Sequence, residues 1–307
     1  MKIRAVCIVK NESDIIEQTL IAASKWCDFI YCFDNGSTDG TWEKILDISA
    51  QFQQVIPYKQ EDCPFRESLG SEIFNHFRAS SVEEDWWCRL DADEIYIDDP
   101  LQFLSLVPQK YKVVVSAVFN YFFTDKDLAI YEHNQFAYVD EIPVEKKCCY
   151  YINNWSEVRF YRYRKDLVWN DDGSHYPSPL QGDAYPIRIR VKNFQYRSPQ
   201  QIDKRIAARR GNVLSFPHEI QAYWKSPESQ ISNISQQTWK DRIIEASRLY
   251  YDAGDGNYVL RPDLMPDLYT MSLIWDSDRT PRNLAKKMFK RFRQKLKTSG
   301  AIPATRN

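Results

Sequence analysis

Two aspartates stand at alternate positions directly after an apolar run, where a buried strand would end. The run covers residues 86–90 (WWCRL), and Asp91, Ala92, Asp93 and Glu94 follow it. In extended backbone, alternate side chains point to the same side of the strand, so the sequence predicts that the carboxylates of Asp91 and Asp93 share one face. Adjacent carboxylates repel unless a cation lies near them, and hard oxygen ligands suit Mg²⁺ or Mn²⁺. The alternative interpretation is an acidic turn in solvent.

A second polar segment, residues 34–41 (DNGSTDGT), follows the apolar run of residues 28–33 (DFIYCF). Its Asp, Asn, Gly and Ser residues are turn formers, so one interpretation is a plain loop between a strand and a helix. The other is functional, because a carboxylate such as that of Asp34 can accept a hydrogen bond from a base imide or a ribose hydroxyl. A third segment, Val9 to Glu12, ends the first apolar run and is either a helix cap or part of the same site.

The elements that position these segments alternate between strand and helix patterns. This order predicts an α/β fold with a parallel sheet, right-handed crossovers and ligands at the carboxyl ends of the strands. The three polar segments would therefore lie at one edge of the sheet. The expected strands are residues 3–9, 28–33, 55–58 and 86–90, with helices near residues 16–23, 42–52 and 68–82.

Beyond residue 111 the pattern changes. Strand-like runs at residues 112–119, 157–163 and 187–191 are separated by long polar loops. From Ser198 onward the patterns are mostly helical, over residues 199–211, 236–251 and 282–297.

Composition narrows the function classes. The chain has 307 residues with 41 Lys and Arg against 42 Asp and Glu, which excludes a globally basic nucleic-acid binder, and no nucleic-acid partner is expected. The two common glycine-rich phosphate loops, G-x-G-x-x-G and G-x-x-x-x-G-K-[ST], are absent from the sequence. Seven cysteines without C-x-x-C spacing indicate free thiols in a reducing cytosol. No apolar stretch reaches the roughly 18 residues of a membrane span, so a cytoplasmic protein is expected.

Taken together, the three segments resemble the opening of family-2 glycosyltransferases, which have the GT-A fold. That family's pattern is an apolar strand ending in Asn-Glu, a strand ending in D-[DN]-G-S-x-D-G-T and an apolar strand ending in D-x-D. This chain has Asn11-Glu12, then residues 34–41, then Asp91-Ala92-Asp93. The resemblance covers roughly residues 1–120 and fades beyond them.

The resemblance implies roles for individual residues. Asp34 would contact the nucleotide base or its ribose, and Val9, Asn11 and Glu12 would line the same pocket. Asp91, Ala92 and Asp93 would flank the sugar diphosphate, with Asp91 and Asp93 on the metal, Mn²⁺ or Mg²⁺. Asn75 matches a frequent family Asn near the donor sugar, and Arg66 is a candidate for holding a phosphate.

The resemblance also implies a single inverting displacement, which needs one general base near the acceptor hydroxyl. The family's base lies well downstream of the acidic pair, and the candidates here are Asp171 and Asp172; an Asp-Gly turn between strands is the alternative. His175 is a candidate for a further metal ligand or a pocket residue. Relatives often have a His shortly before Tyr-Arg-Ser in this half, and this chain has Asn193 there.

The function expected is metal-dependent transfer of a sugar from a nucleotide-sugar, with a UDP-sugar favoured, to a saccharide, lipid-linked or protein acceptor. The alternatives are a nucleotide-sugar-binding protein without turnover and a metal-dependent nucleotidyltransferase. The expected domains are residues 1–198, with a nucleotide-sugar half (1–110) and an acceptor half (111–198), and a helical extension over residues 199–307.

The C-terminal segment 282–297 (RNLAKKMFKRFRQKLK) has eight basic residues and no acid. Its apolar residues recur at helical spacing, so it is typical of a basic amphipathic helix. Such a helix either contacts an anionic membrane peripherally, on the inner face, or packs on the acidic body of the protein.

Overall fold

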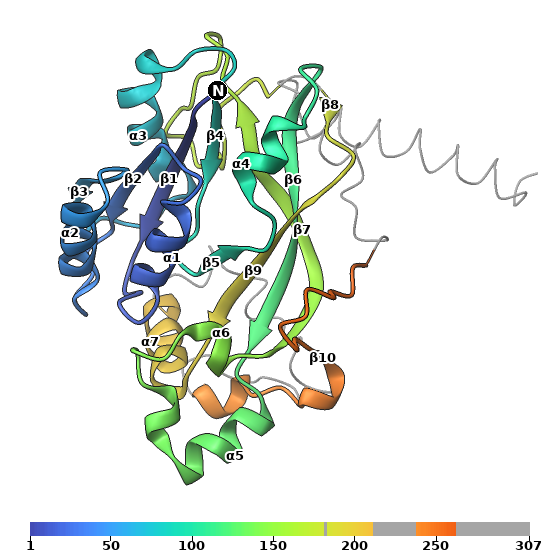
Figure 1. The fold of residues 1–307 in the computed structure, drawn as a ribbon. Coiled ribbons are helices and arrows are strands. Elements are labelled where there is room, and N and C mark those ends of the chain that lie inside the picture. Colours follow the sequence, from blue (N-terminus) through green and yellow to red (C-terminus); the bar gives the residue numbers. More distant parts are fainter. Residues whose placement is uncertain (181–182, 211–237, 262–307) are drawn as a thin grey trace, which may run out of the picture.

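The computed structural model describes residues 1–180, 183–210 and 238–261 (Figure 1). The described part is built on one ten-stranded sheet with the order β3-β2-β1-β4-β7-β6-β9-β5, to which β8 and β10 add through β6 and β7. The strands are β1 (Ile3–Val9), β2 (Phe29–Asp34), β3 (Val55–Gln60), β4 (Trp86–Arg89), β5 (Glu94–Tyr96), β6 (Tyr111–Phe122), β7 (Tyr150–Arg162), β8 (Asp183–Ala184), β9 (Ile189–Tyr196) and β10 (Tyr250–Tyr251).

The first four strands form the parallel half of the sheet that the sequence predicts. β1 is central and pairs in parallel with β2 on one side and β4 on the other. The register sets Val9 opposite Asp34 and Val6 opposite Arg89. The carboxyl ends of β1, β2 and β4 therefore meet at one edge, which confirms the expected α/β class with helices flanking the sheet.

The helices cover both faces of this half sheet because the strands are apolar on both sides. Side chains of α1 and α2 pack on one face around Ala5 and Cys7, and α3 packs on the other around Val6 and Phe33. The helices are α1 (Ile16–Ala23), α2 (Thr41–Gln51), α3 (Gly70–Phe77), α4 (Pro100–Ser105), α5 (Asp125–His133), α6 (Val144–Lys147) and α7 (Pro199–Arg210).

The second half of the sheet is mixed. β7 runs antiparallel to both β4 and β6, whereas β9 runs parallel to β6. β5 closes the series by pairing antiparallel with β9, which sets Glu94 opposite Asn193. The acidic segment after β4 therefore leads directly from one half of the sheet to the far end of the other.

The predicted helix over residues 236–251 is wrong from residue 238 onward, where the structure describes the chain. The chain forms two short 3-10 turns, Trp239–Arg242 and Ala246–Arg248, and then β10, which pairs with β7. The two tyrosines of β10 favour a strand, because aromatic side chains pack well on a pleated surface. The predicted basic helix over residues 282–297 lies outside the described residues.

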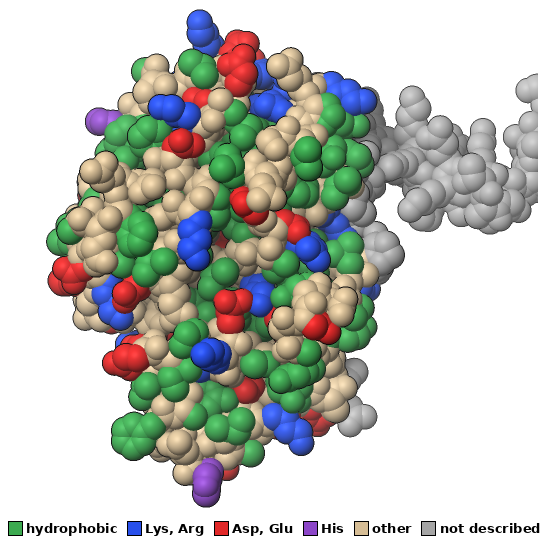
Figure 2. Space-filling view, viewed as in Figure 1, with side chains coloured by type: hydrophobic (Ala, Val, Ile, Leu, Met, Phe, Trp, Pro, Cys, Tyr) green, Lys and Arg blue, Asp and Glu red, His purple; other side chains and the backbone are tan. Residues whose placement is uncertain are grey.

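Two further observations concern membrane-spanning helices and the distribution of surface charge. Within the described ranges, no helix combines the length and apolar character needed to cross a membrane. Acidic and basic side chains of the described residues are interspersed on the face shown in Figure 2 and form no patch of one sign there.

Candidate functional site at the carboxyl edge of the sheet

Asp34, the last residue of β2, is fully buried. Its Oδ1 accepts a hydrogen bond from the backbone N–H of Ser37 at 2.7 Å, and its Oδ2 has no hydrogen-bond partner. A buried carboxylate oxygen without a partner is costly, so such an atom calls for a functional explanation. The carboxylate is thus able to accept one more hydrogen bond at the end of the strand.

The turn after β1 is locked to the turn after β2. Asn11 has a left-handed backbone (φ 57°), which Asn tolerates better than most residues. Its backbone N–H donates to Ser37 Oγ at 2.8 Å, and its side-chain oxygen accepts from the N–H of Thr38 at 2.9 Å. Gly36 has φ 76°, and a Cβ there would lie 2.8 Å from the Cα of Asp62, so only glycine fits. The two loops therefore form one preorganised unit.

Asp91 lies in a cluster of carboxylates that sequence reasoning did not find. One oxygen each from Asp91, Glu94 and Glu157 lie within 4.8 Å of one another. Arg159 donates from Nη2 to all three, at 3.0 Å to Asp91, 2.5 Å to Glu157 and at shorter range to Glu94. Arg89 adds a second guanidinium, whose Nε lies 3.0 Å from Asp91 Oδ1. The described structure thus balances this acidic cluster with two arginines.

Burial and the neighbouring arginines shift the pKa values of the acids in this cluster in opposite directions. Burial alone would raise the pKa of Asp91, but the guanidinium groups of Arg89 and Arg159 hold that pKa below its ordinary value. Burial raises the pKa of Glu94 well above its ordinary value, although Arg159 opposes the shift. Glu94 Oε2 is buried and has no hydrogen-bond partner. These residues fit a hard divalent cation, because the three carboxylates offer oxygen ligands and one of those oxygens lacks a partner.

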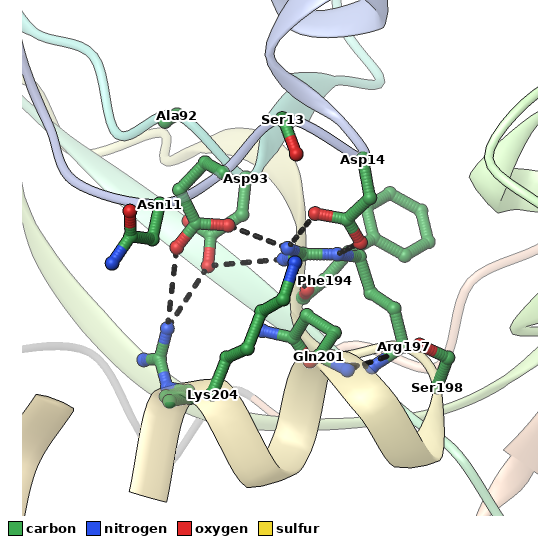
Figure 3. Close-up of polar contacts among 12 residues, drawn as sticks. Asn11, Ser13, Asp14, Ala92, Asp93, Phe194, Arg197, Ser198, Gln201 and Lys204 are labelled. Carbon is green, nitrogen blue, oxygen red and sulfur yellow. Dashed lines mark hydrogen bonds and ion pairs between the residues drawn. The ribbon is translucent and has the colours of Figure 1, made fainter. Parts of the chain in front are cut away.

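Asp93 lies in a different cluster, in which α7 and the residues before it meet the loop after β1 (Figure 3). Arg197 is buried, and its Nε and Nη2 donate to Asp14 at 2.8 and 2.7 Å, while Nη2 also donates to Glu12 at 2.5 Å. The Asp93 carboxylate lies 3.9 Å from Arg197 Nη1 and 3.6 Å from Arg205 Nη1. The side chains of Asp91 and Asp93 thus have different ion-pair partners.

The backbone explains this separation. The N–H of Glu94 donates to the carbonyl oxygen of Asp91 at 3.2 Å, so residues 91–94 form a turn instead of continuing β4. The rule that alternate side chains share a face holds for extended backbone and fails here. The sequence predicts a cation near both Asp91 and Asp93. Both carboxylates could bind that ion only if this turn changed its conformation or if the ion lay between the two sides of the turn.

Glu12 is the most perturbed acid of the second cluster. Burial raises the pKa of Glu12 to about 7, against the opposing effect of Arg197. For Asp14, burial would raise the pKa, but the bidentate Arg197 lowers it below its ordinary value. Glu12 was predicted to line the nucleotide pocket, and the structure places its carboxylate against Arg197 and 3.8 Å from Arg205.

Asp171 is paired with Arg66, the predicted phosphate ligand. Arg66 Nε and Nη2 each lie 3.0 Å from one Asp171 oxygen, and Ser68 Oγ donates to Oδ1 at 2.5 Å. Asp172 lies on the surface and accepts from the backbone N–H of Ser174 at 3.0 Å. The structure therefore places Arg66 against Asp171, which is the chain neighbour of Asp172.

His175 lies beside the Asp91 cluster. Its side chain is 54% exposed, and Nδ1 lies 3.3 Å from both Glu67 Oε2 and Arg89 Nη1. Arg89 also contacts Asp91, so His175 is connected to the acidic cluster through an arginine. No direct contact of His175 with the acidic cluster itself is established among the described residues.

The remaining predicted residues, Asn75, Val9 and Ala92, take part in hydrogen bonds to backbone carbonyl oxygens. Asn75 donates its side-chain amide to the carbonyl oxygen of Trp169 at 2.7 Å, so it ties α3 to the segment before Asp171. Val9 and Ala92 are buried, and their carbonyl oxygens accept hydrogen bonds from Asn35 and Thr19, respectively.

Sequence reasoning missed Glu94 as a metal candidate and missed both arginines, Arg159 and Arg197. Glu157 was visible as a polar residue in an expected strand, but nothing local indicates which strand would pair with β4. Arg197 stands between Tyr196 and Ser198 just before a helix, and nothing in the sequence distinguishes it from a surface arginine. Its burial and its carboxylate partners are visible only in the structure.

No protein-family model matches the chain, and no curated protein matches it. Among solved structures, it is similar to mannosyltransferase PcManGT from Pyrobaculum calidifontis in complex with GDP-Man and Mn²⁺, with 14% identity, 74% of this chain and 66% of that chain covered, and a TM-score of 0.34. It is also similar to S. aureus TarS 1-349 in complex with UDP, with 16% identity, 38% and 35% covered, and a TM-score of 0.28.

A third similar structure is the apo form of glycosyltransferase GlyE in Streptococcus pneumoniae TIGR4, with 18% identity, 38% of this chain and 29% of that chain covered, and a TM-score of 0.25. The chain thus spans less than two thirds of each of these proteins, and about a third or less of TarS and GlyE. At these identities and scores the likeness identifies no ligand or activity for this chain.

Proposed function

We propose that this protein transfers a sugar from a nucleotide-sugar to an acceptor hydroxyl at the carboxyl edge of β1, β2 and β4. The observation that carries the proposal is the fully buried carboxylate of Asp34, whose Oδ2 has no partner at the end of its strand. A base imide or a ribose hydroxyl would supply the missing hydrogen bond. The turns of Asn11 and Gly36, which are hydrogen-bonded to each other, would hold the Asp34 carboxylate in position before a nucleotide binds.

Asp91, Glu94 and Glu157 would hold a divalent ion, Mn²⁺ or Mg²⁺, with Arg159 balancing their charge when the ion is absent. When bound, the ion would supply a positive charge against the diphosphate leaving group. Asp93 remains a proposed ligand, and in the described structure its carboxylate faces Arg197 and Arg205.

The reaction proposed is a single displacement with inversion at the anomeric carbon. The acceptor hydroxyl must lose a proton as it attacks, and a carboxylate within hydrogen-bond reach would take it. Asp171 and Asp172 are the proposed bases. Arg66, through its ion pair with Asp171, would keep that loop in position, and the same guanidinium is a proposed phosphate ligand.

The test of the nucleotide site is calorimetry with UDP and GDP. Asp34→Ala should weaken binding by about 1.5–3 kcal/mol, the range for a hydrogen bond to a charged group. Asp47→Ala is the matched control, because Asp47 is an exposed aspartate of α2. If neither nucleoside diphosphate binds the wild-type protein, or if Asp34→Ala binds with wild-type affinity, the proposed site is wrong.

The test of turnover uses a panel of labelled nucleotide-sugars with Mn²⁺ or Mg²⁺. Release of the sugar, as transfer or slow hydrolysis, would separate an enzyme from a nucleotide-sugar-binding protein. Release of pyrophosphate from a nucleoside triphosphate and a sugar phosphate would instead indicate a nucleotidyltransferase.

A further inference from the structure

Trp155 is an unusually exposed aromatic residue in the middle of β7. The residue is 55% exposed, although the neighbouring strand β6 is buried almost throughout. The register sets Trp155 opposite Val118 and Glu157 opposite Ser116. Trp155 and Glu157 are two residues apart in a regular stretch of strand, so their side chains point to the same face. Their Cα atoms are about 7 Å apart. The exposed indole therefore lies beside the carboxylate cluster of Asp91.

A row of three amide side chains crosses the sheet on that same face. Asn193 of β9 donates to Asn120 of β6 at 2.9 Å, and Asn120 donates to Asn154 of β7 at 2.6 Å. Asn154 immediately precedes Trp155, at a position where the register between β6 and β7 shifts. A bulge of this kind allows consecutive side chains to point to one side, so that Asn154 reaches Asn120 while Trp155 keeps the face of Val118.

The end of the amide row is not satisfied. Asn193 Oδ1 is buried and has no hydrogen-bond partner, and Asn193 lies opposite Glu94 of β5, whose Oε2 also has none. Uncharged amides offer both donors and acceptors, which is what sugar hydroxyls require. A flat apolar ring with a few convergent polar groups is the usual composition of a small-molecule site.

We infer that Trp155 and the amide row form the acceptor subsite and that the acceptor is a saccharide. The indole stacks on the apolar face of a pyranose ring, and the amides bind its hydroxyls. The ring then lies next to Glu157, with one hydroxyl directed toward the edge where Asp91 lies. This inference rests on the proposed function for its meaning in catalysis, but the binding of a saccharide is testable without any nucleotide.

The probes are the methyl β-glycosides of glucose, galactose and N-acetylglucosamine. Saturation-transfer NMR on the full chain measures their contact with the protein in the absence of nucleotide. At least one glycoside should give a signal with the wild type, and Trp155→Ala should reduce it by about fivefold or more, the effect of losing one aromatic stacking partner. Trp155→Phe should retain most of the signal because it keeps a ring.

Phe136→Ala is the matched control, because Phe136 is also a highly exposed aromatic, at 80%, on a separate 3-10 turn. It should leave the signal unchanged, and UDP affinity should be the same in both variants and the wild type. The inference is overturned if no glycoside contacts the wild type or if Trp155→Ala keeps the full signal. If the wild type binds a glycoside but does not bind UDP, the result would count against the proposed function and not against this subsite.

Discussion

The guanidinium of Arg197 forms two hydrogen bonds with the carboxylate of Asp14, at 2.8 and 2.7 Å, across 183 positions of sequence. Arg197 lies just before α7, and Asp14 lies in the loop between β1 and α1. This pair therefore ties the start of α7 to the loop that follows the first strand. A bidentate pair of this kind fixes orientation as well as distance. It holds the candidate nucleotide loop against α7 (Figure 3).

Arg197→Ala should strongly destabilise the protein, because it leaves the largely buried carboxylates of Asp14 and Glu12 without their cation. The expected loss is about 3–5 kcal/mol in the free energy of unfolding by urea. Arg197→Lys keeps the charge and loses the fork, so its loss should be smaller. Arg164→Ala, which removes a surface pair with Asp166, should cost less than about 1 kcal/mol. Equal losses for the two alanine variants would contradict the structural role of Arg197.

Glu12 should make stability depend on pH. Its pKa is raised from 4.5 to about 7 in the folded state, so the folded protein holds a proton that the unfolded chain releases. The stability that this proton contributes is complete below pH 4.5 and is lost as pH rises to about 7, by about 3 kcal/mol at most. Arg197, Arg205, Asp93 and Asp14 are the charged groups that face Glu12.

Glu12→Gln removes this titration, so its free energy of unfolding should fall less than that of the wild type between pH 4.5 and 7. Urea melts at half-unit pH intervals measure the difference. Asp14 has a lowered pKa and loses its stabilising effect only in acid, below its ordinary value, so it does not interfere in this window. Parallel curves for the variant and the wild type would show that Glu12 is ionised throughout.

The carboxylate cluster should determine metal affinity. Calorimetry with Mn²⁺ should show that Asp91→Asn and Glu157→Gln each weaken binding by more than about 10-fold, since removal of a ligand exceeds the effect of an outer-shell partner. Glu132→Gln, an exposed acid of α5, is the control and should bind as the wild type does. Asp93→Ala tests the other predicted ligand. Loss of binding in Asp93→Ala alone would place the ion with Asp93 instead of Glu157.

The general base should be revealed by separating kcat from donor affinity. If Asp171 or Asp172 takes the acceptor proton, its Asn variant should keep UDP affinity and lose about 10²–10⁴-fold in kcat. Asp171→Asn also weakens the ion pair with Arg66, so Ser68→Ala, which removes another partner of Asp171, controls for loop geometry. Normal kcat in both Asn variants would show that another carboxylate takes the acceptor proton.

The sequence by itself determined the parallel half of the fold. Apolar runs and turn residues place Val9, Asp34 and Asp91 at or just after the ends of strands, and parallel strands with right-handed crossovers bring such positions to one edge. That prediction is confirmed by the register of Val9 with Asp34. This prediction depends only on local sequence pattern and on a topological rule, so one sequence is sufficient to make it.

Tertiary structure alone decided which charges meet. Glu157 and Arg159 reach Asp91 because β7 pairs antiparallel with β4, and that pairing depends on contacts between strands about 70 positions apart. Asp91 and Asp93 have separate partners because a hydrogen bond from Glu94 to Asp91 turns the backbone between them. No periodicity in the sequence encodes either feature, since long-range pairing and the choice between turn and strand are settled by the packing of the whole sheet.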